Sequence, residues 1–238
     1  MSWAGLLAEL EKSRQQLDRR MEALLVEAQD KRIGIFCEKG CRNCCHLSVS
    51  CSFPEAVAIV GGLNERQRRA ISEKLPALRQ ISLQATDLTG YLRLFLNQLG
   101  GCPLLDPVDG SCTVYPLRPF SCRTLISTRN SSWCAVDFAE LHPLEKEAFL
   151  SSLDPDIVTF PTHYLAASQE FGLDMESLAL VAMREIFGVS LSGNLIYLLW
   201  LELAHRLSEV VTGGFAKTRD FLEERQLDLP FMLQLQGD

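Results

Sequence analysis

The stretch CEKGCRNCC, from Cys37 to Cys45, holds four cysteines in nine positions, and two of them are adjacent. Spacings of two or three residues allow several sulfurs on one loop to point at a common centre. A helix would instead spread these side chains around its axis, because successive positions turn by about 100°. The stretch therefore predicts an irregular loop that binds metal.

A second group of cysteines follows at intervals of about ten residues, and Cys51 belongs to neither group. Thiolate is a soft ligand that selects zinc, copper(I) or iron–sulfur clusters over magnesium and calcium. Eight cysteines are enough for two tetrahedral ions, or for one cluster with additional ligands. The expected metal ligands are Cys37, Cys41, Cys44, Cys45, Cys102, Cys112, Cys122 and Cys134.

The local sequence favours an iron–sulfur cluster, with zinc as the alternative cofactor. The adjacent Cys44 and Cys45 suit a larger cluster or two nearby centres, because neighbouring side chains diverge. Pro103 follows Cys102 directly, and a Cys-Pro step also ends the ligand run of bacterial ferredoxins. The second group lacks the compact Cys-x-x-Cys pairs that are common in zinc fingers.

Two arginines flank Cys122 and are expected to contact the cofactor. The guanidinium groups of Arg118 and Arg123 can donate hydrogen bonds to cluster sulfurs and offset their negative charge. Ordinary surface salt bridges are the alternative for both arginines. Trp133 is expected to shield Cys134 from water.

Other reactive side chains have structural explanations. Cys51 is expected to be a small buried thiol, because it stands outside both groups. His46 is expected to be a polar neighbour of the site and not a ligand. The other histidines are expected to be satisfied or exposed, and not ligands: His142, His163 and His205.

The chain has 238 residues, a net charge of −7 and an isoelectric point near 5.2. This acidic balance disfavours nucleic acid and anionic membrane surfaces as partners. The longest apolar run, Leu195–Leu201, is too short to cross a bilayer, and no secretory signal is recognisable. We therefore expect a cytoplasmic protein, where metal or redox cysteines are favoured over the alternative of disulfides. The expected partner is a metal ion or cluster, with another protein as a further option.

The predicted fold is mainly α, with irregular cysteine-rich loops and at most a short β-hairpin around the metal site. Short strands are expected at His46–Ser50 and Cys112–Tyr115. A single domain is expected over residues 1–238, with the cysteine module at 37–134 and flanking helices at 1–35 and 135–238. Apolar periodicity and capping residues predict helices over the first thirty residues, at 54–60, from 65 with a break or kink at Pro76, and at 87–99, 143–151, 162–171, 174–187, 194–212 and 215–225.

The order of these cysteine elements resembles the YkgJ-type cysteine-cluster family, the CxxCxxCC zinc- or iron-chelating domain. The family pattern reads Cys-x-x-Cys-x-x-Cys-Cys, a Cys-Pro, then Cys-x-Ile-Tyr with Arg-Pro and Cys-Arg. The resemblance covers about residues 37–134, and departs from the pattern where three residues separate Cys37 from Cys41 and where Val114 replaces isoleucine. The matching positions are the eight cysteines above together with Tyr115, Arg118, Pro119 and Arg123.

The resemblance implies a metal-binding protein whose role is structural, redox or metal-handling. One relative, a flagellin lysine-N-methylase, joins this module to methyl transfer, so the alternative is an iron–sulfur-dependent enzyme such as a protein lysine methyltransferase. The sequence has no glycine-rich loop typical of the common S-adenosylmethionine-binding fold, because Leu99–Gly101 is explained as a helix end. A third hypothesis is an interaction protein in which metal only shapes a docking surface.

Overall fold

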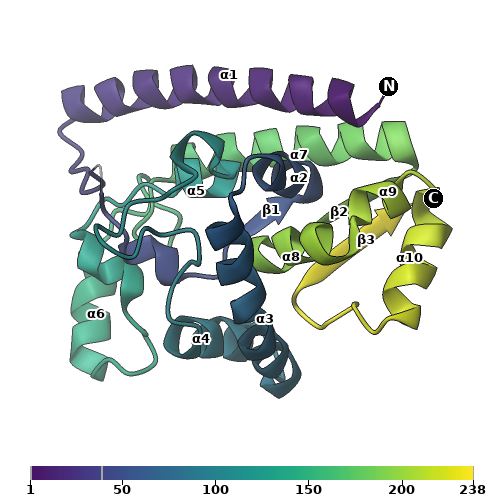
Figure 1. The fold of residues 1–238 in the computed structure, drawn as a ribbon. Helices are drawn as coiled ribbons and strands as arrows, with labels where there is room; N and C mark the ends of the chain where they lie inside the picture. Colours follow the sequence, from purple (N-terminus) through teal and green to yellow (C-terminus); the bar gives the residue numbers. More distant parts are fainter. Residues whose placement is uncertain (1, 39, 238) are drawn as a thin grey trace.

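The structure is a computed structural model that describes residues 2–38 and 40–237. Most of it is helical, which confirms the mainly α prediction, and a small antiparallel sheet lies among the helices (Figure 1). The helices that position the site are α1 Trp3–Asp30, α2 Phe53–Gly61, α3 Glu65–Gln84, α4 Leu88–Gln98, α5 Phe120–Thr124, α6 Pro143–Ser151, α7 Ala166–Phe187, α8 Leu195–His205, α9 Leu207–Val211 and α10 Gly214–Glu224.

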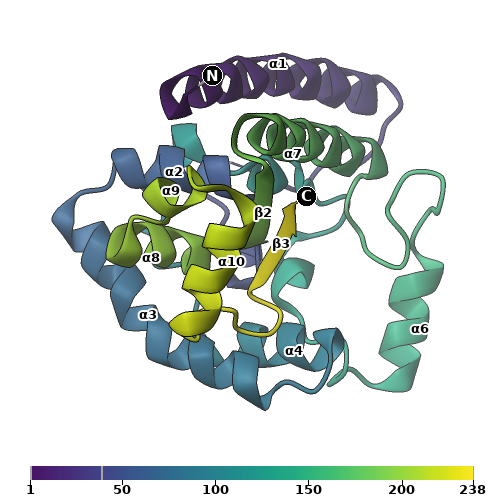
Figure 2. The same ribbon diagram turned by 90° about the vertical axis from the view of Figure 1, so that its right-hand side faces the viewer.

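The N-terminal helix α1 lies alongside α7 across one side of the molecule (Figure 1, Figure 2). The hydroxyl of Ser2 caps its start by accepting a hydrogen bond from the backbone N–H of Gly5. Leu10 and Leu17 on its inner face are buried in a cluster with Met175 of α7. Tertiary packing of such an apolar stripe, more than capping, stabilises a long helix.

Three strands form one sheet in the order β1-β2-β3: β1 Ser50–Ser52, β2 Val189–Asn194 and β3 Leu233–Gly237. Every residue of β2 is buried, and this strand pairs antiparallel with both neighbours. Gly193 is needed in β2, because a side chain there would collide with the backbone of Met232. The sheet therefore joins distant parts of the chain, where the sequence predicts at most a short hairpin.

The hydrophobic core extends from the sheet to the cysteine loops. One cluster contains Phe53 of α2, Tyr91 of α4 and Tyr197 of α8, all of them almost fully buried. Burying a side chain of the size of phenylalanine contributes roughly 1.5–3 kcal/mol. Cys102 and Cys112 pack against the same cluster, so the core supports the cysteine loops directly.

Two strand predictions are wrong in position. The strand expected at His46–Ser50 begins only at Ser50, because residues Asn43–His46 form a 3-10 turn. The strand expected at Cys112–Tyr115 is replaced by an isolated bridge between Leu105 and Cys112, followed by a 3-10 turn. In both cases a 3-10 turn stands where the sequence predicts part of a strand or the residues that follow it.

Three helix predictions also need correction. Helix α3 continues through Pro76, because Leu78 and Ile81 beyond it are buried in the core and compensate for the lost hydrogen bond. The helices expected at 162–171 and 174–187 are the single helix α7, and the helix expected at 194–212 is divided into α8 and α9 at Arg206, whose φ is +48°.

Among the described residues, no helix is both long and apolar enough to cross a membrane.

Candidate metal centre

The cysteines of both groups lie on loops and short helical turns that meet in space. Cys44 and Cys45 belong to the 3-10 turn Asn43–His46, and Cys122 belongs to the short helix α5. The backbone N–H of Cys102 donates to the carbonyl of Cys45 at 2.9 Å. This hydrogen bond joins the two groups directly, although 57 positions separate the residues.

A cavity of about 260 Å³ lies where these segments meet, and we call it the six-cysteine cavity. Most of its other walls are apolar, and include Leu47, Phe95, Leu104 and Ile196. Thiols that face an apolar space form a donor set suited to a soft metal or a cluster. The cysteines that line it are Cys41, Cys44, Cys45, Cys102, Cys112 and Cys122.

A second cavity of about 690 Å³, which we call the outer cavity, is lined by α1 residues and by the cysteine loops. Cys41, Cys44 and Cys122 line both cavities, so the two adjoin. Cys37 lines the outer cavity and is the one exposed residue of the nine cysteines. The residue at the irregular spacing therefore lies on the side of the centre that faces α1.

Cys134 is buried and lines neither of these two cavities. Its 3-10 turn, Ser131–Ala135, packs against the turn that carries Cys44. Burial raises the pKa of Cys134, and negative charge on Cys44 and Cys41 would raise this pKa further. Cys134 is therefore a spatial neighbour of the first cysteine group, although the sequence places it with the second.

All nine cysteines are free thiols in the structure, and none of them forms a disulfide. Within residues 2–38 and 40–237, no three cysteine, histidine, aspartate or glutamate side chains converge tightly enough to hold one metal ion. The sulfurs of the six-cysteine cavity instead surround a common space.

Burial, together with interactions between the cysteines, raises the pKa of four residues that line this cavity and favours their thiol form: Cys44, Cys102, Cys112 and Cys122. Burial, with a contribution from Cys112, raises the pKa of Cys102 to about 11. A hydrogen bond with Cys45, followed by burial, raises the pKa of Cys44 above the range of free cysteine, and burial does the same for Cys122. Metal ligation requires the thiolate form, so a metal that binds here must displace these protons.

Arg118 supplies positive charge beside the thiols. Its guanidinium opposes the burial and neighbouring thiols that raise the pKa values of Cys44, Cys112 and Cys122. The same group stacks on the ring of Tyr115, with its Cζ 3.7 Å from the ring centroid. Its buried Nε has no hydrogen-bond partner within the described part of the chain, and the residue lines both cavities. A free donor in this position fits the predicted contact with cluster sulfurs.

Arg123 is held by α1 and by its own loop. Its Nε donates to the carbonyl of Arg118 at 2.9 Å, its Nη1 pairs with Asp18 at 2.6 Å, and its Nη2 donates to the carbonyl of Pro116. Arg123 lines the outer cavity. A role for Arg123 in holding the cofactor stays a prediction.

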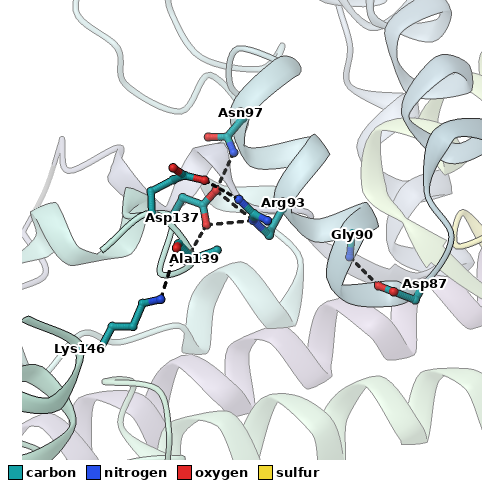
Figure 3. Close-up of polar contacts among 8 residues, drawn as sticks. Asp87, Gly90, Arg93, Asn97, Asp137, Ala139 and Lys146 are labelled. Carbon is teal, nitrogen blue, oxygen red and sulfur yellow. Dashed lines mark hydrogen bonds and ion pairs between the residues drawn. The ribbon is translucent and has the colours of Figure 1, made fainter. Parts of the chain in front are cut away.

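A polar network fixes the segment after Cys134 against α4, the helix that leads into Cys102 (Figure 3). Arg93 Nε donates to both carboxylate oxygens of Asp137 at 3.2 Å, and Asn97 Nδ2 donates to the same carboxylate at 2.8 Å. Burial acts to raise the pKa of Asp137, but these hydrogen bonds lower it overall. The network therefore sets the distance between two segments that carry candidate ligands.

Most other side chains have the expected structural roles. Cys51 is fully buried in β1, opposite Gly193, and lines neither cavity. The Trp133 ring packs on Phe149, with centroids 4.3 Å apart. Of the remaining histidines, His46 ends its 3-10 turn and His142 caps α6. His205 packs edge-on against Trp200, but its buried Nε2 has no hydrogen-bond partner among the described residues.

His163 is a neighbour of Cys134 that the sequence does not reveal. Its Nε2 lies 3.4 Å from Cys134 Sγ, although 29 positions separate the two residues. No motif or spacing links them, because the contact depends on how the loop before α7 folds back. The signal exists only in the tertiary structure.

One family model matches part of the chain. Residues 36–142 match the model of CxxCxxCC, described as "Putative zinc- or iron-chelating domain". The matched segment contains all eight candidate ligands, which confirms the resemblance drawn from the motif. No curated protein and no solved structure matches the chain.

Proposed function

We propose that the segment matched by the CxxCxxCC model, residues 36–142, holds an iron–sulfur cluster through the thiolates of the six-cysteine cavity. The observation that carries the proposal is this cavity, because six cysteines from separate segments face one space. Zinc is the alternative cofactor, since it takes the same soft ligands.

The size of the cavity supports a cluster more than a single ion. Holding one water requires roughly 10–15 Å³ of such space, and the cavity measures about 260 Å³. A cluster of several iron and sulfide atoms can span sulfurs that do not converge on one point. The adjacent Cys44 and Cys45 both line the cavity, and a centre of this extent can accept both.

Charge and solvation support the same proposal. A cluster held by at least four of these thiolates is anionic, and Arg118 offers a free donor beside Cys44 and Cys122. The apolar walls of the cavity limit the access of water to the centre. Cys37 and Cys134 complete the proposed ligand set on the side that adjoins Cys41 and Cys44.

The proposed role is structural, with redox or metal handling as further uses of the same centre. A cluster held by cysteines from several loops would cross-link segments that are distant in sequence. Metal binding would then be coupled to the folding of these loops.

The test is the composition and colour of protein purified without oxygen. Iron and acid-labile sulfide in matched amounts, with broad visible absorption, are expected. A colourless preparation that contains zinc would overturn the preference for a cluster, and a protein with no bound metal would refute the proposal.

A pair of matched variants identifies the ligands. Cys44→Ser should lose most of the metal, because Cys44 lines both cavities. Cys51→Ala should retain it, because Cys51 lies in the sheet and faces neither cavity. Equal loss from both variants would show that the assigned ligands are wrong.

A further inference from the structure

The loop between α6 and α7 brings a polar side chain to the sulfur of Cys134. His163 Nε2 lies 3.4 Å from Cys134 Sγ, and both residues are buried, with 3% and 5% of their surface exposed. Tyr164, which follows His163 in the chain, lies near the same sulfur. Both residues lie outside the matched segment 36–142.

The position of the His163 ring is fixed on several sides. Its backbone carbonyl accepts hydrogen bonds from the N–H and the hydroxyl of Thr128, at 2.9 and 2.8 Å. The imidazole packs against Tyr164, with centroids 4.3 Å apart, and meets Phe149 edge-on at 5.8 Å. A ring held in this way loses little freedom when it forms a hydrogen bond.

The geometry favours a donor over a metal ligand. Among the described residues, no third ligand converges with His163 and Cys134. Buried sulfur that carries negative charge needs a nearby donor, because an unpaired buried charge is costly. An imidazole ring has an N–H to donate whether it is neutral or charged.

We propose that His163 is a positioning residue of the metal centre, which donates its Nε2–H to the Cys134 sulfur. This inference rests on the proposed function, since it assigns Cys134 to the centre. A residue from the C-terminal half of the chain thereby changes the reduction potential of a centre whose ligands lie in the matched segment. A hydrogen bond to a ligating sulfur withdraws electron density from it and raises the reduction potential of the cluster.

The test compares non-donor and donor variants of the metal-loaded protein. His163→Phe keeps an aromatic ring without an N–H, His163→Leu is a second non-donor, and His163→Gln supplies an amide N–H. The matched control is His205→Phe, because His205 also packs among aromatic rings but lies in α8. The readouts are metal content, the visible charge-transfer bands and the midpoint potential, or the bands of the Co²⁺-substituted protein if zinc is the native metal.

Non-donor variants should bind metal but have shifted bands and, with iron, a lower midpoint potential. His163→Gln should restore part of the shift, and His205→Phe should match the unsubstituted protein. A folded, metal-loaded non-donor variant with unchanged bands and potential would overturn this inference alone. Absence of metal from the unsubstituted protein would overturn it together with the proposed function.

Discussion

At the scale of single residues, Arg118 is the side chain on which the electrostatics of the centre depend. It lines both cavities, and its buried Nε has no partner within the described residues. Every cysteine pKa that it influences is otherwise raised, mainly by burial or by neighbouring thiols. A positive charge here offsets part of the cost of forming thiolates in a low-polarity cavity.

Arg118→Gln should weaken metal binding by about 10- to 100-fold, because it removes a donor beside the ligands. Competition with a chelator measures the affinity. Arg19→Gln is the matched control, since Arg19 is exposed on α1 and lines neither cavity. Equal affinities of the two variants would show that Arg118 does not interact with the metal centre.

Glu176 on α7 makes the stability of the fold depend on pH, independently of the metal centre. Burial, with repulsion from the buried Glu55, raises the pKa of Glu176 to about 7. A carboxyl whose pKa is raised in the folded state stabilises the fold below its unfolded pKa, near 4.5, and loses that contribution as pH rises through 7.

Glu176→Gln should therefore gain stability relative to the unsubstituted protein as pH rises from about 4.5 to 8, by on the order of 2 kcal/mol. Denaturant unfolding at several pH values measures the difference. Glu170→Gln on the exposed face of the same helix is the control and should show no comparable trend. A difference for Glu176→Gln that stays constant with pH would contradict the burial argument.

At the scale of elements, the network of Figure 3 holds the Cys134 segment against α4. Asp137 has a lowered pKa because hydrogen bonds from Asn97, Ala139 and Arg93 outweigh the effect of burial. Its charged form therefore stabilises the fold above the ordinary pKa of 3.8. That contribution is lost as pH falls through the lowered value.

Asp137→Asn should destabilise the protein by about 1 kcal/mol at neutral pH, because the interaction is partly exposed to solvent. The loss should shrink when unfolding is measured in acid. Asp156→Asn, at an exposed position outside the network, should have little effect at either pH. A loss for Asp137→Asn that persists in acid would mean that packing, not charge, explains it.

The elements also show what the sequence can and cannot predict. Periodicity and capping residues predict α1, α4, α6 and α10 well, because each has a clear start or end and α1 also buries a continuous stripe. The strands β2 and β3 give no comparable signal, since they are short and pair with partners far along the chain. Asp174 and Pro76 look like boundaries, but tertiary packing keeps α7 and α3 continuous through them.

Local sequence patterns likewise predict only part of the candidate site. Cysteine spacing predicts eight ligands in two groups, because closely spaced soft ligands in a reducing compartment favour metal binding, and six of these eight residues line the six-cysteine cavity. It does not predict that Cys134 lies beside Cys44, or that His163 reaches its sulfur at 3.4 Å. Those relations depend on how the loops fold, which local patterns do not encode.

At the scale of the whole molecule, the helices and sheet form a framework around loops that have little regular structure. The core supports Cys102 and Cys112 from one side, and α1 and α5 support Cys122 and Arg123 from another. The loops would gain their remaining stability from the bound metal, because each ligand restrains a different segment.

Removal of metal with a chelator should therefore lower the melting temperature and expose the 36–47 loop to proteases. Metal bound to the native state stabilises it by about 4 kcal/mol when its concentration is roughly 1,000 times Kd. Limited proteolysis with mass spectrometry measures the second effect. Cleavage confined to α3 or α10, with the cysteine loop unchanged, would contradict the proposed coupling.

X-ray absorption at the metal edge of protein purified without oxygen tests the central claim most directly. We predict a first shell dominated by sulfur, together with metal–metal scattering, and we predict that Cys44→Ser and Cys122→Ser each reduce the signal because the two sequence groups share one centre. A first shell of oxygen and nitrogen, or loss of metal from only one of these variants, would contradict the account.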